Sequence, residues 1–205
     1  MPERCVRRVA ALLALAAAGA APAPGPSHAA PPATTPSTAP DVGHPRGDWD
    51  KGAWTFHTYG GYVNDLGPYD VEGGFAAAGF NYYLVDGISL GGEVAGYGIS
   101  QPVHNAVAVA PGIVFRHHLV DTGNSSFFVD VAGAMFFANE RVPDEGTDFN
   151  FATQAGIGLT QKLGGGSHLL LGVRFFHLSN ANLEGDDRNP SLNGISAYVG
   201  LMFRL

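Results

Sequence analysis

The chain has 205 residues, of which 11 are Lys or Arg and 18 are Asp or Glu, so its formal net charge at pH 7 is −7. This length allows one ordinary domain, or a small domain with appendages. The acidic balance argues against a nucleic-acid partner, because nucleic-acid binding depends on Lys and Arg side chains that neutralise phosphates.

The first 29 residues carry the pattern of a secretory signal peptide. Arg4, Arg7 and Arg8 precede the uncharged run "VAALLALAAAGAA", which small residues follow. A membrane anchor is the alternative reading, but the apolar run is too short to span a bilayer. The sequence therefore predicts export, with cleavage after "SHA" at 27–29 or after "APA" at 21–23.

Removal of residues 1–29 takes away the single cysteine, Cys5, and leaves 8 basic and 17 acidic residues, for a net charge of −9. The mature protein then has neither a disulfide nor a thiol nucleophile. Residues 30–50 are rich in Pro, Thr and Ala and are predicted to form a linker. After residue 29 the sequence has no run of about 18 apolar residues, so it predicts no transmembrane helix there. Residues 51–205 remain to form the folded domain.

From Trp54 onward apolar side chains alternate with small or polar ones, and clusters of Gly, Asp, Asn and Pro interrupt the pattern. Such alternation predicts β-strands with one apolar face. The segments that follow it number eight: 53–63, 71–85, 88–99, 105–119, 126–138, 149–162, 167–179 and 194–205. Most exceed the roughly five or six residues of a soluble strand and reach the roughly nine to eleven that a tilted strand needs to cross a bilayer.

One apolar face and one small or polar face recur along these segments. In 149–162, Phe149 and Phe151 alternate with Asn150 and Gln154. A soluble barrel or sandwich would turn the apolar face inward, whereas an outer-membrane barrel turns it toward lipid. The export signal, the strand lengths and a last segment that reaches Leu205 favour the membrane alternative. We therefore predict an all-β fold, an eight-stranded antiparallel transmembrane β-barrel in the bacterial outer membrane, with an interior filled by its own side chains.

The topology follows if both ends of the barrel domain lie in the periplasm. Periplasmic turns are then expected at about 85–88, 120–125 and 163–167. Outward loops are expected at 64–70, 100–104, 139–148 and 180–193. A set of charged residues falls on the polar faces and is expected to form a buried polar network: Glu93, Asp130, Arg116, Arg174 and Arg204.

The segment "LLLGVRFFHLSNANLEG", residues 169–185, begins as a strand whose odd-numbered residues are apolar and face lipid. His177 and Ser179 continue that face toward the outer leaflet. A His within hydrogen-bond reach of a Ser is the minimum arrangement for a nucleophilic hydroxyl with a general base. From spacing alone, the alternative that both residues mark the polar rim of the barrel stays open.

The stretch "RFFHLSNANL", followed by "NPSLNG", resembles the outer-membrane lipid A 3-O-deacylase (PagL-type) family. Members carry an Arg-x-x-His-x-Ser-Asn-Ala motif on the seventh strand of an eight-stranded barrel. The resemblance implies an esterase that removes the 3-O-linked acyl chain of lipid A in lipopolysaccharide. It implies Ser179 as the nucleophile, His177 as its base, and backbone amides around Asn180 and Ala181 as the oxyanion hole, which acyl transfer requires.

The sequence departs from the family at the third catalytic position. Members place a Glu four residues after an Asn to orient the His, and counting from Asn189 this position is Asn193. An amide oxygen can hold an imidazole in one tautomer, as in Cys-His-Asn proteases, but it adds no charge. The loop acids Glu184, Asp186 and Asp187 are the alternatives, with Glu184 the first of them.

His117 and His118 are adjacent and point to opposite faces of a strand, so they predict no shared metal. We expect no cofactor and no metal site, and lipid A in the outer membrane as the partner. The sequence leaves open whether the barrel is a monomer or a homodimer. It also leaves open a non-catalytic barrel with a structural or adhesive role.

Overall fold

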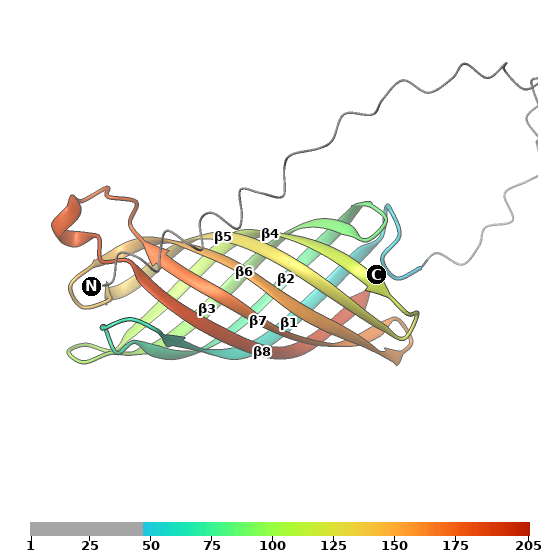
Figure 1. Ribbon diagram of the computed structural model, residues 1–205, viewed down its shortest axis with the longest axis horizontal. Coiled ribbons are helices and arrows are strands. Elements are labelled where there is room, and N and C mark those ends of the chain that lie inside the picture. The colour runs from blue at the N-terminus through green and yellow to red at the C-terminus, as the bar shows by residue number, and fades with distance from the viewer. Residues whose placement is uncertain (1–46) are drawn as a thin grey trace, which may run out of the picture. The chain divides into compact units, whose positions relative to one another are not determined.

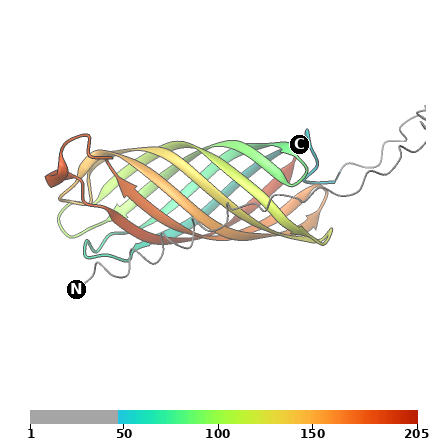
Figure 2. The same ribbon diagram turned by 45° about the horizontal axis from the view of Figure 1, so that its top comes forward.

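The computed structural model describes residues 47–205; the predicted signal peptide and residues 30–46 of the predicted linker lie outside the described residues. Within 47–205, eight antiparallel strands close into one barrel, in which each strand pairs with its sequence neighbours and the last pairs with the first (Figures 1 and 2). The strands are β1 (Trp54–Asp65), β2 (Glu72–Val85), β3 (Ile88–Ser100), β4 (Ala106–Asp121), β5 (Ser125–Val142), β6 (Thr147–Gly164), β7 (Ser167–Ser179) and β8 (Leu192–Arg204). The predicted eight-stranded antiparallel barrel is confirmed.

The two faces of the barrel wall carry different side chains, as the alternation predicts. On β7, Leu171, Val173 and Phe175 are 38–46% exposed on the outside, while the intervening Arg174 and Phe176 are buried inside. A hydrophobic exterior on every strand matches a surface that contacts lipid rather than water. No helix within residues 47–205 is long and apolar enough to cross a membrane.

The barrel has two distinct ends, which we name after the predicted topology. Tight turns at 86–87, 122–124 and 165–166 lie at the periplasmic end, together with residue 47 and the end of β8 (Figure 1). Longer connections lie at the outer end, and the longest runs from Asn180 to Ser191 and contains the short 3-10 helix η2 (Asp186–Arg188).

The predicted outward loop 139–148 is wrong in extent. Strands β5 and β6 continue beyond the predicted ends, with Val142 paired to Thr147, so the connection shrinks to residues 143–146. The polar side chains of this stretch are typical of loops, which is why the alternation pattern missed it. Outside the membrane such side chains stay in water while the two backbones still pair with each other.

The middle of the barrel interior holds a paired network of charges. Asp130 accepts hydrogen bonds from Arg116 (3.0 Å) and Arg174 (2.9 Å), and Glu93 lies 3.7 Å from Arg174 and 3.0 Å from His57 Nε2. The Arg and acidic residues balance each other in number, as burial requires, because an unpaired buried charge is strongly destabilising. Four of the five predicted members, Glu93, Asp130, Arg116 and Arg174, thus meet in one network.

The outer third of the interior is apolar instead. Strand residues and the nearby loop supply its lining: Val63, Val71, Tyr97, Ile99, Phe136, Val142, Phe176, Leu178 and Leu192. They leave a cavity of about 10 Å³, which is room for one water at most. Side chains therefore fill the barrel directly beneath the outer-end loops.

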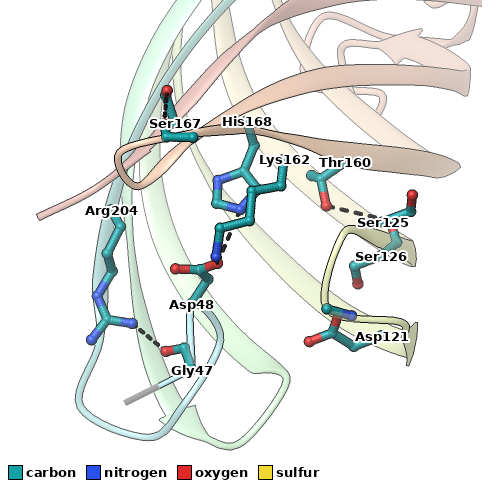
Figure 3. A network of polar contacts seen from close by, with 12 residues as sticks. Gly47, Asp48, Asp121, Ser125, Ser126, Thr160, Lys162, Ser167, His168 and Arg204 are labelled. Atoms are coloured by element: carbon teal, nitrogen blue, oxygen red, sulfur yellow. Dashed lines mark hydrogen bonds and ion pairs between the residues drawn. The ribbon is translucent and has the colours of Figure 1, made fainter. Parts of the chain in front are cut away.

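A segment that we call the strap, residues 47–53, crosses the periplasmic end (Figure 3). Trp49 is 6% exposed, and its ring stacks on the His118 ring with 4.1 Å between centroids. The backbone oxygen of Trp49 accepts a hydrogen bond from Gly87 N (2.8 Å). The linker predicted from the Pro, Thr and Ala content of residues 30–50 includes Trp49, and the structure places Trp49 with the barrel.

Charged contacts fasten the strap as well. Asp48 Oδ2 lies 2.7 Å from Lys162 Nζ and 3.2 Å from His168 Nε2 (Figure 3). Partial burial raises the pKa of the Asp48 carboxyl, but the hydrogen bond from Lys162 and the charge of His168 lower it by more, so the pKa lies below its ordinary value. The resulting stabilisation is present above the ordinary Asp pKa of about 3.9 and is lost as the pH falls through the lowered value.

Arg204 is the one predicted member that the observed interior network lacks. Its guanidinium donates to the backbone oxygen of Gly47 in the strap (Figure 3). The reason is its position as the last residue of β8, which places it at the periplasmic mouth rather than in the middle of the barrel.

We predict that Trp49→Ala lowers the free energy of unfolding by about 3 kcal/mol, because it removes a buried aromatic side chain. Urea unfolding in one detergent would measure the change. Trp54→Ala is the matched control, since Trp54 is 50% exposed on the lipid-facing side of β1. Equal losses in the two variants would contradict a stabilising role for the strap.

Candidate active site

Strand β7 carries a polar pair at the outer end of its lipid-facing side. His177 and Ser179 are half-buried, and the residue between them, Leu178, points into the apolar layer of the interior. Because successive side chains on a strand alternate between faces, both polar residues face outward, as the sequence predicts. They lie at the point where the outward apolar series of β7 ends.

The neighbouring strand brings in the third side chain. In the β7–β8 register His177 lies opposite Asn193, and Asn193 Oδ1 is 2.8 Å from His177 Nδ1. On the other side of the ring, His177 Nε2 is 3.2 Å from Ser179 Oγ. The Asn193 Nδ2 group donates to the backbone oxygen of Ser191 (3.3 Å), which directs the amide oxygen toward the imidazole.

This arrangement fixes the tautomer of the imidazole. An amide oxygen only accepts hydrogen bonds, so the proton of His177 lies on Nδ1, and Nε2 is left as an acceptor for the Ser179 hydroxyl. A hydroxyl that donates to an imidazole held in this way is the arrangement of an activated serine. The three side chains are therefore placed for nucleophilic chemistry at the lipid surface.

The acidic residues of the loop after β7 lie elsewhere. Glu184 Oε2 pairs with Arg188 Nη1 at 3.3 Å, and Asp186 and Asp187 are exposed in η2. Within residues 47–205 the position beside His177 Nδ1 is held by Asn193 and not by Glu184. Across the same residues no group of three or more His, Cys, Asp or Glu side chains could hold a metal ion.

Asn180 organises the loop that follows the serine. Its side chain is 1% exposed, and its Nδ2 group donates to the backbone oxygen of Arg188 (2.8 Å) and to Thr147 Oγ1 (3.3 Å). Its own backbone N–H donates to Asn189 Oδ1 (2.9 Å). The amide of Asn180 is therefore engaged within the loop in this structure.

Ala181 has an uncommon backbone conformation beside this engaged amide. Its φ is 53°, in the left-handed region, and Asn182 follows with φ of 64°. Residues other than Gly, Asn and Asp rarely adopt this backbone region. Within the described part of the chain, the Ala181 N–H donates no hydrogen bond, unlike the amides of Asn180 and Asn182 beside it.

Sequence reasoning missed Thr147 and Asn189, which hold Asn180. Thr147 lies on β6 and is brought to the site by the pairing of β6 with β7, so no local signal could have found it. The family pattern uses Asn189 only to locate position 193. In the structure the side-chain oxygen of Asn189 accepts a hydrogen bond from the Asn180 N–H and so holds the loop.

A serine hydroxyl backed by an imidazole on the lipid-facing rim of a membrane barrel defines a class of protein, the membrane-embedded ester hydrolases. Residues 46–202 match the family model "Lipid A 3-O-deacylase (PagL)". The chain belongs to this family and is an ester hydrolase of the bacterial outer membrane.

Solved structures with the same fold have little sequence in common with this chain. Neisserial surface protein A (NspA) superposes with a TM-score of 0.58 at 11% identity, covering 76% of this chain and 98% of that one. The outer-membrane enzyme PagL gives 0.51 at 17% identity (70% and 97% covered), and OprG from Pseudomonas aeruginosa gives 0.51 at 7% (78% and 99%). At these identities the likeness shows the fold alone. No curated protein matches the chain significantly.

We predict that Ala181→Gly keeps ester hydrolysis within about twofold, because Gly adopts positive φ without strain. Ala181→Val should lower the rate at least about tenfold, since a β-branched residue there strains the loop beside Ser179. The measurement is hydrolysis by purified, folded barrels. Ala197→Val, on an extended and lipid-facing part of β8, is the control, and a silent Ala181→Val would contradict the conformational requirement.

Proposed function

We propose that this protein hydrolyses the 3-O-linked acyl ester of lipid A by a Ser/His mechanism, with Ser179 as the nucleophile and His177 as the general base. The observation that supports it is the double contact of His177, with Ser179 Oγ at one ring nitrogen and Asn193 Oδ1 at the other. The membership in the lipid A 3-O-deacylase family supplies the substrate.

In the first step His177 Nε2 takes the hydroxyl proton of Ser179 while Oγ attacks the ester carbonyl carbon. The tetrahedral intermediate carries negative charge on the former carbonyl oxygen, and we assign its stabilisation to the N–H of Ala181. Collapse of the intermediate breaks the bond to the sugar oxygen, which leaves as the 3-hydroxyl after taking the proton from His177. Water then hydrolyses the acyl-serine by the same steps and releases a fatty acid.

Asn193 acts in this mechanism as a positioning residue. Its amide oxygen keeps the Nδ1–H tautomer and the ring orientation that the base needs, as in Cys-His-Asn proteases. Unlike a carboxylate it carries no charge, so it does not stabilise the imidazolium that forms during proton transfer. The three residues thus divide the task into attack, proton transfer and orientation.

Ser179→Ala and His177→Ala should each abolish deacylation, with losses of about 10³-fold or more, and the double variant should be little worse than either, because such residues act as a unit. Mass spectrometry of lipid A from cells with and without each variant measures the product. Heat-modifiable migration on gels controls for folding. Substantial activity of Ser179→Ala would show that the nucleophile is misassigned, and an inactive wild-type barrel would favour the non-catalytic, structural or adhesive alternative.

Asn193→Ala should slow hydrolysis by less than the loss in Ser179→Ala, because general-base catalysis is worth about 10²–10⁴-fold and orientation is one part of it. Asn193→Glu should preserve or raise the rate, since a carboxylate adds charge stabilisation to the same hydrogen bond. Glu184→Gln is the matched control in the loop. A silent Asn193→Ala together with an inactive Glu184→Gln would overturn the assignment of Asn193.

A further inference from the structure

The side of Ser179 from which a substrate can approach follows from the strand register. The β8 side of His177 is taken up by Asn193, which is bonded to its ring. On the opposite side lies β6, where Phe151 is the cross-strand partner of Ser179 and Thr153 is the partner of His177. Directly opposed residues have Cβ atoms roughly 4.5–5.5 Å apart, so an ester held at Ser179 Oγ contacts these β6 side chains.

This side also leads into the membrane. Ser179 is the last residue of β7, whereas its partner Phe151 is only the fifth residue of β6. Phe151 in turn pairs with Met135 on β5, and seven further residues of β5 follow Met135. The strands cross the barrel wall obliquely, and from β7 through β6 to β5 neighbouring residues lie progressively nearer the periplasmic end (Figure 1). An apolar chain that descends from Ser179 along the membrane normal therefore passes over β6 and β5.

The surface on that path has small residues between bulky ones. The small residues are Thr153 and Gly133, which pair across β5 and β6 and form one patch, and a Cβ added at Gly133 would meet no atom within 4 Å. Toward the outer end it is bordered by Phe151, whose ring packs on Phe149 at 5.1 Å between centroids. Toward the periplasmic end Val131, 52% exposed, stands beside it. We call this patch, Thr153 and Gly133 together with the bordering Phe151, the acyl notch.

We propose that the acyl notch receives the fatty chain of the ester and that Gly133 sets the length of chain accepted. The inference rests on the proposed function, because it starts from Ser179 as the nucleophile. The chemistry of the surface identifies its occupant: the notch faces hydrocarbon and carries no charged side chain, which suits an acyl chain and not a phosphorylated sugar. The sugar lies on the outer side of the ester, at the level of the loops.

The test compares Gly133→Ala and Gly133→Leu with Gly96→Ala and Gly96→Leu. Gly96 on β3 is also lipid-facing, also has open space around an added Cβ, and lies away from the site. The substrates are glucosamine 3-O-esters with short, medium and long saturated chains in one mixed-micelle system. The ratio of kcat/KM for long against short chains should fall about tenfold in Gly133→Leu and less in Gly133→Ala, and should not change in either Gly96 variant.

A second pair of variants tests the border of the notch. Phe151→Ala should raise KM more for long chains than for short ones, because it removes binding shared by ground and transition states. Phe115→Ala, on the lipid-facing side of β4, should change neither. An unchanged chain-length ratio in Gly133→Leu, with wild-type activity intact, overturns the notch. A wild-type barrel that hydrolyses none of the esters overturns the proposed function instead.

Discussion

The whole structure depends on one constraint, that every backbone N–H and C=O inside a bilayer must find a partner within the protein. A closed barrel satisfies this with strand pairing alone, and β1 closes the ring by pairing with β8. Closure forces each side chain either outward to lipid or inward to the core, with no intermediate choice. A polar residue on the outward side is therefore costly except at the rim, where His177, Ser179 and Asn193 lie.

The interior of the barrel determines the geometry on its exterior. Leu178 and Leu192 lie opposite each other in the β7–β8 register and are almost fully buried in the apolar layer. Because side chains alternate, this inward pair fixes the same register that sets His177 against Asn193 on the outside. A slip of β8 by one residue would turn Leu192 out and Asn193 in, so the packing of the core and the geometry of the site both depend on this register.

The sequence predicts what alternation and motif spacing can encode. Strand number, order and the facing of β7 follow from residues such as Leu171, Val173 and Phe175, because apolar residues at every second position mark the lipid-facing side of a strand. The ends of β5 and β6 do not follow, because strands that leave the membrane lose the apolar face that marks them. Trp49 could not be placed either, since its partner His118 is distant in sequence. The contact of Asn180 with Thr147 is non-local for the same reason.

The neutral Asn193 has a consequence for where the site must obtain its electrostatic stabilisation. At the edge of the hydrocarbon a carboxylate is costly to desolvate, whereas an amide of similar shape is held at lower cost. In the proposed mechanism this amide leaves the imidazolium of His177 uncompensated at the moment when the oxyanion forms. That mechanism then assigns charge stabilisation to backbone dipoles beside Ser179, and these depend on the left-handed turn at Ala181. That turn is held by the buried side chain of Asn180, which accepts from Asn182 N (2.9 Å). In the proposed mechanism the hydrogen-bonded loop after β7 therefore supplies the stabilisation that a neutral Asn193 does not.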